Sequence, residues 1–235
     1  YGSDLDLIAA FDGDRPTPGA DSDPAQFYGR FAQLTARVLS ALTREGYVYR
    51  VDFRLRPEGT AGRMASSLRR LTEYIRERAS AWELTAYLKV RPVAGDPDFG
   101  AHVRGEVIRC VFEACDTRES WDAVKAELAA TRAGLERDHG RKGRNIKWGR
   151  GGMMDVYFVT RYAQLRERVD FPPELGTHAL IEYLGGAGIL RPEDAAALAD
   201  GYAFLRAIDH ALRLIGDRSA TALPEDPDLL EEVAG

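Results

Sequence analysis

Two aspartates separated by one residue stand near the start of the chain, directly after a glycine and a serine. The run reads Gly2-Ser3-Asp4-Leu5-Asp6. Residues two apart in a strand point to the same side, so the carboxylates of Asp4 and Asp6 can bind one or two Mg²⁺ ions together. Gly2 and Ser3 offer backbone N–H groups and a hydroxyl that can approach a phosphate. The run therefore predicts a site for a metal-bound phosphate.

A third carboxylate, Asp52, lies in a segment, residues 47–56, whose apolar and polar residues alternate as in a strand. Burying Asp52 on a sheet face is costly unless the carboxylate is paired with a cation. Its neighbours on that face are basic: Arg50, Arg54 and Arg56. If this strand pairs with the first one, Asp52 completes the carboxylate site. Arg54 and Arg56 are candidates to bind a triphosphate, although a solvated or ion-paired arginine face is equally common.

Three carboxylates that hold two Mg²⁺ ions favour one class of reaction, nucleotidyl transfer. The ions would orient a triphosphate, bring an attacking hydroxyl in line with the α-phosphate and neutralise charge on the leaving pyrophosphate. Asp52 is also our candidate for easing the proton off the attacking hydroxyl. A lone Asp-x-Asp is usually a solvated strand end, but Gly-Ser before it and the strand around Asp52 make the prediction specific.

Other polar residues are weaker candidates. Lys89 and Arg91 precede Gly95-Asp96-Pro97, a domain boundary of the kind where ligands often bind, so we count both as candidate nucleotide ligands. The loop from Lys147 to Gly152 contains three glycines ahead of a helix and could hold an anion at the helix N-terminus. A tight interdomain turn is the slightly favoured interpretation of this loop. We interpret the Trp82-Glu83 pair as packing and a structural acid.

The elements that must position these residues alternate between strand and helix in the first part of the chain. Residues 4–11 and 47–56 predict two strands. Between them, Asp23 and Pro24 begin a helix that we expect Gly46 to end. One apolar stripe runs along this helix and consists of Phe27, Phe31, Leu34, Val38 and Leu42. A helical period resumes at Ser66.

Beyond the Gly95-Asp96-Pro97 boundary the sequence predicts helices only. Their expected limits are about residues 98–114, 118–138, 152–168, 176–186 and 193–216. We therefore expect an α+β fold in two domains. Residues 1–96 would form a domain with a small mixed sheet, and residues 97–235 an all-α helical bundle.

Composition excludes several classes of protein. The 235 residues carry a net charge of −5, which argues against nucleic acid as a partner, and no apolar run is long enough to cross a membrane. Cys110 and Cys115 lack the spacing of a zinc or redox pair, so we expect reduced thiols. The start of the chain lacks the features of a signal peptide. We expect a cytoplasmic protein of which this chain is an internal piece.

Five runs of sequence resemble the glutamine synthetase adenylyltransferase family, occur in the family's order and span nearly the whole chain. They are Gly2 to Leu7, Tyr49 to Gly59, Ala81 to Glu83, Lys89 to Asp96 and Asn145 to Gly152. The resemblance implies a nucleotidyltransferase domain of the polymerase-β type, incomplete at its N-terminus, followed by a helical domain. It also implies that Asp4, Asp6 and Asp52 bind Mg²⁺ and that Gly2 and Ser3 contact the phosphates of ATP.

The resemblance further implies a reaction and partners. Members of the family transfer AMP from ATP to a tyrosine of glutamine synthetase, which regulates nitrogen assimilation. A second, homologous half of these proteins removes the AMP by phosphorolysis. A small nitrogen-signalling protein and glutamine act as regulators in the family.

Three features depart from the family pattern or divide between its halves. Tyr157 stands where an acid is common, and the strand and lysine-glycine stretch that usually precede Gly-Ser are absent from this sequence. The run from Gly2 to Asp6 and Asp155 resemble the adenylylating half, whereas Arg50 resembles the deadenylylating half. We predict the adenylylating half and keep the deadenylylating half as the alternative.

Two functions of other kinds remain as alternatives. A non-catalytic nucleotide-binding sensor has no need to keep three mutually repelling carboxylates together. A nucleotidyltransferase that acts on RNA would need a basic stripe with aromatic residues, which this acidic sequence lacks, and nothing in the sequence indicates a small-molecule acceptor such as an antibiotic.

Overall fold

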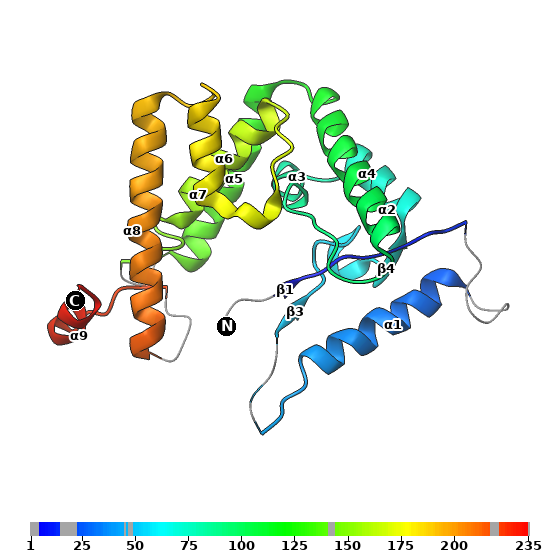
Figure 1. The fold of residues 1–235 in the computed structure, drawn as a ribbon, viewed down its shortest axis with the longest axis horizontal. Coiled ribbons are helices and arrows are strands. Elements are labelled where there is room, and N and C mark those ends of the chain that lie inside the picture. Colours follow the sequence, from blue (N-terminus) through cyan, green and yellow to red (C-terminus); the bar gives the residue numbers. More distant parts are fainter. Residues whose placement is uncertain are drawn as a thin grey trace. The chain divides into compact units, whose positions relative to one another are not determined.

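Parallel pairing of short strands organises the first part of the chain (Figure 1). The computed structural model describes residues 5–14, 23–44, 46, 49–140, 144–216 and 221–234. Strand β1 (Leu5–Asp6) pairs with β3 (Val51–Asp52), and β2 (Ala9–Phe11) pairs with β4 (Ala65–Ser67). The strand predicted at residues 4–11 therefore exists as two pieces that pair with different partners. The named strands pair only in parallel within the described residues, whereas we expected a mixed sheet.

The second predicted strand, at residues 47–56, is shorter than its alternating pattern indicates. Of its described residues, 49–56, only Val51 and Asp52 belong to β3. The chain turns immediately afterwards, because the N–H of Arg56 donates to the carbonyl of Phe53 at 3.1 Å. A short 3₁₀ helix, η1 (Gly59–Ala61), follows this turn. Period-2 alternation thus located the strand, and local turn hydrogen bonds shortened it.

Helix α1 (Pro24–Leu39) begins where the sequence predicts. Pro24 is its first residue, and the carboxylate of Asp23 accepts a hydrogen bond from the N–H of Ala25 at 3.2 Å. The helix ends at Leu39 with Ser40 as its C-cap, several residues before Gly46.

The side of α1 that packs on the strands differs from the apolar stripe of the sequence. Gly29 and Ala32 are buried, and α1 packs against β2 and β4. Tyr28 fixes the helix on β2 by stacking on Phe11, with ring centroids 5.0 Å apart. The apolar stripe is instead largely exposed, at Phe31, Leu34, Val38 and Leu42. Small residues on the packed side allow close approach, which leaves the large apolar side chains facing outward.

Helices α2 (Leu68–Glu77), α3 (Ala81–Tyr87) and α4 (Pro97–Asp116) complete the first compact unit, Tyr1–Asp116. Both α2 and α3 pack on α4, with buried side chains that include Leu71, Ile75, Leu84, Val107 and Val111. The division between units therefore falls after α4, because this helix belongs to the core of the first unit. It differs from the domain boundary that we expected between residues 96 and 97.

The second unit, Thr117–Gly235, contains helices without named strands in its described part. Its elements are α5 (Trp121–His139), α6 (Met153–Arg166), η2 (Pro173–Leu175), α7 (Gly176–Gly186), α8 (Pro192–Gly216) and α9 (Pro227–Ala234). Val169, Phe171, Leu180 and Leu184 form one cluster of its core. The predicted helices are present, and α9 is an addition to them. The predicted α+β class with an all-helical second part is confirmed.

Two properties expected from composition can be compared with the structure. Cys110 and Cys115 are buried free thiols in α4, and burial raises the pKa of the Cys110 thiol. None of the described helices combines the length and the apolar character needed to cross a membrane.

Glu83 connects the end of α2 to the start of α3. Its Oε2 accepts hydrogen bonds from the N–H and hydroxyl of Ser80 at 2.8 and 2.7 Å, and its Oε1 accepts one from the hydroxyl of Tyr74 at 2.7 Å. Burial, assisted by the hydrogen bond to Glu83, raises the pKa of Tyr74 to about 12. These contacts make Glu83 a structural acid.

We expect Glu83→Ala to lower the free energy of unfolding by about 2 kcal/mol, because it removes the acceptor of Ser80 and Tyr74. It should also lower the Tyr74 pKa from about 12 towards its ordinary value of 10.0. The raised pKa stabilises the fold at a pH below the unfolded pKa, and this stabilisation is lost as the pH rises through the folded pKa. Because the variant has a lower folded pKa, it should lose this stabilisation at a lower pH. Urea unfolding and ultraviolet titration measure both effects, with Glu77→Ala on exposed α2 surface as control. An unchanged Tyr74 pKa would contradict the proposed contact.

Candidate active site

Asp6 and Asp52 are directly paired residues of β1 and β3. The ladder is fixed by hydrogen bonds from the N–H of Leu5 to the carbonyl of Arg50 at 2.7 Å and from the N–H of Leu7 to the carbonyl of Asp52 at 2.8 Å. Paired residues of neighbouring parallel strands project to the same face and lie about 4.8 Å apart. The predicted pairing of the two strands is thus present, and it places Asp52 beside Asp6.

The remaining part of the predicted cluster cannot be placed in the same way. Gly2, Ser3 and Asp4 lie outside the described residues. Within the ranges that the structure describes, no group of three or more His, Cys, Asp or Glu residues is placed to hold a metal ion. Two of the three predicted carboxylates are therefore brought together, and the complete site stays a prediction.

Arg54 holds the carboxylate of Asp52. Its Nε donates to Oδ2 at 2.6 Å, its Nη2 lies 2.5 Å from the same oxygen, and its backbone N–H donates to Oδ1 at 2.7 Å. The side-chain hydrogen bond from Arg54 holds the pKa of Asp52 below its ordinary value. The Asp52 side chain is 13% exposed and that of Arg54 is 72% exposed. Asp52 is thus an ionised, largely buried carboxylate whose cationic partner can move into solvent.

This arrangement suits a hard cation such as Mg²⁺. Mg²⁺ binds carboxylate oxygens and keeps several waters. Proteins usually supply it with one or two carboxylates, and two lie on one face here. Two like charges side by side also need a cation to offset their repulsion. Arg54 supplies that charge at Asp52 in this structure, and a bound Mg²⁺ would replace it.

Arg56 has a different partner set, made of backbone carbonyls from its own loop. Its Nη1 donates to Phe53 at 3.0 Å, its Nη2 to Thr60 at 3.1 Å and its Nε to Gly62 at 3.1 Å. These three bonds close the loop that follows β3. The structure gives Arg56 a structural role, so Arg54 becomes the better candidate for a phosphate contact.

Residues outside the predicted site hold the same loop from outside. Glu58 has a φ of 64° and binds two arginines of α2 and its C-cap, Arg70 at 3.0 Å and Arg78 at 3.1 Å. A Cβ at Gly62 would lie 1.8 Å from the carbonyl oxygen of Pro57, so only glycine fits there. The Pro-Glu-Gly turn signal in the sequence could have indicated this rigid loop.

Lys89 and Arg91 lie just after α3 and are exposed. The N–H of Lys89 donates to the carbonyl of Ala86 at 3.0 Å, which continues the helical turn. Their predicted contact with a nucleotide stays a prediction.

The glycine-rich loop of the second unit is organised around its own side chains. The Oδ1 of Asn145 accepts hydrogen bonds from the N–H groups of Lys147 and Trp148 at 3.0 and 2.8 Å. A Cβ at Gly149 would lie 2.4 Å from the carbonyl oxygen of Asn145, and one at Gly152 would lie 2.7 Å from that of Ile146. The glycines are therefore required by close backbone packing.

A protein carboxylate, that of Asp155, accepts a hydrogen bond from the backbone at the start of α6. Its Oδ2 accepts a hydrogen bond from the N–H of Gly151 at 2.6 Å. Arg132 of α5 binds both Asp155 oxygens, at 2.5 and 3.1 Å, and donates to the carbonyl of Gly149 at 2.8 Å. These contacts favour a tight structural turn over an anion site. Spacing by four along Val124, Leu128 and Arg132 could have indicated that Arg132 is buried.

Tyr157, at the position where the family resemblance leads us to expect an acid, lies one helical turn before a buried arginine. The guanidinium carbon of Arg161 is 5.8 Å from the Tyr157 ring centroid, and its Nη1 donates to Gln164 at 2.5 Å. Arg161 has no carboxylate partner among the described residues, and burial lowers its pKa. Arg161 is thus packed near an aromatic ring and bonded to an amide.

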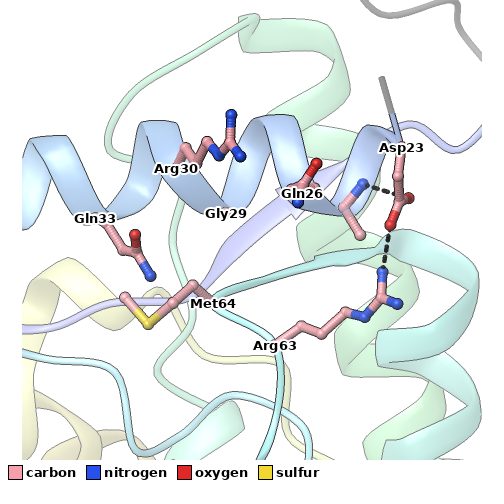
Figure 2. Close-up of a pocket in the computed structure, with 8 residues that line it drawn as sticks. Asp23, Gln26, Gly29, Arg30, Gln33, Arg63 and Met64 are labelled. Atoms are coloured by element: carbon pink, nitrogen blue, oxygen red, sulfur yellow. Dashed lines mark hydrogen bonds and ion pairs between the residues drawn. The ribbon is translucent and has the colours of Figure 1, made fainter. Parts of the chain in front are cut away.

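A cleft of about 370 Å³ lies between α1 and the segment Arg63–Met64 (Figure 2). Arg63 spans one end of it through an ion pair with Asp23 at 2.8 Å. Figure 2 shows Gln33 pointing towards Met64, whereas Arg30 points away from it. The lining residues do not include Asp6, Asp52 or Arg54, so this cleft is separate from the carboxylate pair.

Two family models place this chain, with its carboxylate-bearing parallel strands and its helical second unit, in a class of nucleotidyltransferase-related proteins. The family described as glutamate-ammonia ligase adenylyltransferase matches residues 1–106, and the family described as GlnD PII-uridylyltransferase matches residues 123–235. The chain belongs to the glutamate-ammonia ligase adenylyltransferase family.

Curated relatives that cover nearly the whole chain carry one name, bifunctional glutamine synthetase adenylyltransferase/adenylyl-removing enzyme. The protein of Mesorhizobium japonicum is 32% identical over 242 residues, which cover 100% of this chain and 24% of the relative. That of Bordetella bronchiseptica is 36% identical over 230 residues, which cover 95% of this chain and 23% of the relative. That of Hahella chejuensis is 34% identical over 241 residues, which cover 99% of this chain and 24% of the relative. The chain thus spans about a quarter of the length of these relatives.

The Asp52–Arg54 contact predicts a carboxyl pKa that can be measured by NMR titration. Asp52 should titrate below 3.8, and Arg54→Ala should raise its pKa towards 3.8. Because the folded pKa is the lower one, this stabilisation is present above the unfolded pKa and is lost as the pH falls through the folded pKa. Arg137→Ala, on the exposed side of α5, is the control. An Asp52 pKa that Arg54→Ala leaves unchanged would rule out the contact.

The different partners of Arg54 and Arg56 predict different effects of the same substitution. Arg56→Ala should lower the free energy of unfolding of the first unit by about 2 to 3 kcal/mol, because three loop carbonyls lose their donor. Arg54→Ala should cost less than about 1 kcal/mol, since its side chain is largely exposed and screened by water. Chemical denaturation of both variants measures the difference. Equal losses would show that Arg56 does not hold the loop.

Proposed function

We propose that this chain carries catalytic carboxylates of an enzyme that transfers AMP from ATP to a tyrosine of glutamine synthetase. One observation supports the chemistry above the others: Asp6 and Asp52 are register partners on adjacent parallel strands. Two carboxylates placed in this way suit a metal-assisted phosphoryl or nucleotidyl transfer. The names of the relatives support glutamine synthetase as the acceptor.

Each predicted site residue except Arg56, which holds the loop after β3, has a role in this proposal. Asp4, Asp6 and Asp52 would hold Mg²⁺, which supplies charge neutralisation on the triphosphate when bound. Gly2 and Ser3 would contact the phosphates through N–H groups and a hydroxyl. Arg54, once displaced from Asp52, could donate guanidinium N–H groups to phosphate oxygens. Lys89 and Arg91 would bind the nucleotide.

Asp52 has a second proposed role, in proton transfer. Its carboxylate is ionised at neutral pH, since Arg54 holds its pKa low in this structure and a bound Mg²⁺ would keep it ionised after Arg54 is displaced. It can therefore accept a hydrogen bond from the attacking tyrosine hydroxyl and ease its deprotonation. A small nitrogen-signalling protein as a regulator, which the family resemblance implies, stays a prediction.

A second candidate function is the removal of AMP from glutamine synthetase by phosphorolysis. The relatives are named for both activities, and the chain covers about a quarter of their length. The same carboxylate pair would serve this reaction through the Mg²⁺ it would hold, which would neutralise charge on the AMP phosphoryl group as orthophosphate attacks it and the tyrosine oxygen leaves, giving ADP. The experiment below distinguishes the two directions.

The test measures transfer of label from α-³²P-ATP to purified glutamine synthetase by the full-length protein. We expect Mg²⁺-dependent labelling, and Asp6→Asn and Asp52→Asn should each reduce it by at least about 100-fold, because a metal ligand is lost from the site. Asp14→Asn, an exposed acid beyond β2, is the matched control and should retain activity. Circular dichroism of each variant shows that it is folded.

The other outcomes select among the alternatives. If Asp6→Asn and Asp52→Asn abolish phosphate-dependent release of ADP from adenylylated glutamine synthetase but leave labelling intact, this part of the protein carries the adenylyl-removing activity. Loss of neither activity in Asp6→Asn and Asp52→Asn would remove both carboxylates from the mechanism. Nucleotide binding that is independent of Mg²⁺, with no turnover in either direction, would favour the sensor alternative.

A further inference from the structure

The outward face of α1 is an apolar surface that no described residue covers. Phe31, Leu34 and Val38 are 65%, 56% and 65% exposed. The opposite side of the helix is already packed, since Gly29 and Ala32 are buried and α1 lies against β2 and β4. A continuous exposed row of large apolar side chains marks a site of interaction.

The spacing of this row is that of a coiled-coil seam. Phe27, Phe31, Leu34 and Val38 are separated by four, three and four residues. These steps are the d, a, d and a positions of two heptads, which insert between the side chains of a partner helix. The four residues, called the α1 seam below, therefore present a surface shaped for one further helix.

The flank of the α1 seam has one sign of charge. Arg30 and Arg37 each precede an a position and so occupy the g positions of successive heptads. Neither forms an ion pair with any residue that the structure describes, and both are exposed. Figure 2 shows Arg30 pointing away from the nearby Arg63–Asp23 ion pair. The segment from residue 24 to residue 44 contains no acidic residue, in a chain whose net charge is −5.

The charge pattern argues against a second copy of α1 as the occupant. In an antiparallel pair, g residues face g residues, so arginine would face arginine. In a parallel pair, g residues face e residues, which here are Tyr28 and Thr35 and offer no negative charge. Either arrangement leaves the basic flank without a partner charge, which disfavours self-association through this face.

We infer that the α1 seam is the docking site for an acidic amphipathic helix of a partner protein. The partner helix supplies apolar a and d residues to the seam and Glu or Asp side chains to Arg30 and Arg37. This surface is separate from the Asp6–Asp52 pair, and the inference does not depend on the proposed reaction.

The first test uses two synthetic amphipathic peptides of equal length, each with Leu at a and d. One carries Glu and the other Lys at e and g. Fluorescence anisotropy should show that the Glu peptide binds the full-length protein at least about fivefold more tightly than the Lys peptide. The double variant Arg30→Glu/Arg37→Glu should reverse this preference, and Arg63→Glu, outside the seam, should leave it unchanged. Equal affinities, or a preference that the double variant does not reverse, would overturn the inference.

A second measurement decides whether the α1 seam is open in the intact protein. A Leu34→Cys variant of the full-length protein should react with a maleimide as fast as an exposed surface cysteine, and the Glu peptide should slow the reaction. Protection without peptide in a monomer would mean that another part of the same protein covers the seam. Protection together with a doubled mass by light scattering would mean that a second copy covers it. Either form of protection would overturn the inference.

Discussion

The parallel pairing of β1 with β3 is the contact on which the proposed chemistry depends, because it sets Asp6 beside Asp52. Two carboxylates at this spacing repel each other unless a cation lies between or beside them. Arg54 supplies positive charge to Asp52 and keeps its pKa low. In this structure the arginine offsets the charge of Asp52, and in the proposed function a Mg²⁺ ion would take its place.

Charged residues around the strand pair mainly fix the backbone. Arg56 closes the loop after β3 through three carbonyls, Glu58 ties that loop to Arg70, and Glu83 joins α2 to α3. In each case a charged side chain satisfies several polar groups at once, which stabilises a loop that lacks regular secondary structure. The motif that resembles the family thus combines the paired aspartates with a larger supporting part.

Sequence periodicity predicted most helices and the two strands that carry the aspartates, because those patterns follow from backbone geometry. It did not predict the length of β3, which a local turn decides, or the packed side of α1. The side of α1 with the small residues Gly29 and Ala32 packs on the strands, and the apolar stripe does not. Among the candidate site residues, Asp6 and Asp52 were predicted as neighbours. The bonding of Arg56 depends on carbonyls up to six residues away, which no spacing rule reveals.

The central claim is that Asp6 and Asp52 bind one cation together, and Mn²⁺ as a substitute for Mg²⁺ tests it most directly. Crystals of the full-length protein grown with Mn²⁺ and a non-hydrolysable ATP analogue would be measured at the manganese absorption edge. The account predicts an anomalous peak about 2.1 to 2.3 Å from a carboxylate oxygen of each aspartate, with Arg54 displaced from Asp52. A peak that touches neither aspartate, or Arg54 still bound to Asp52 beside the nucleotide, would contradict it.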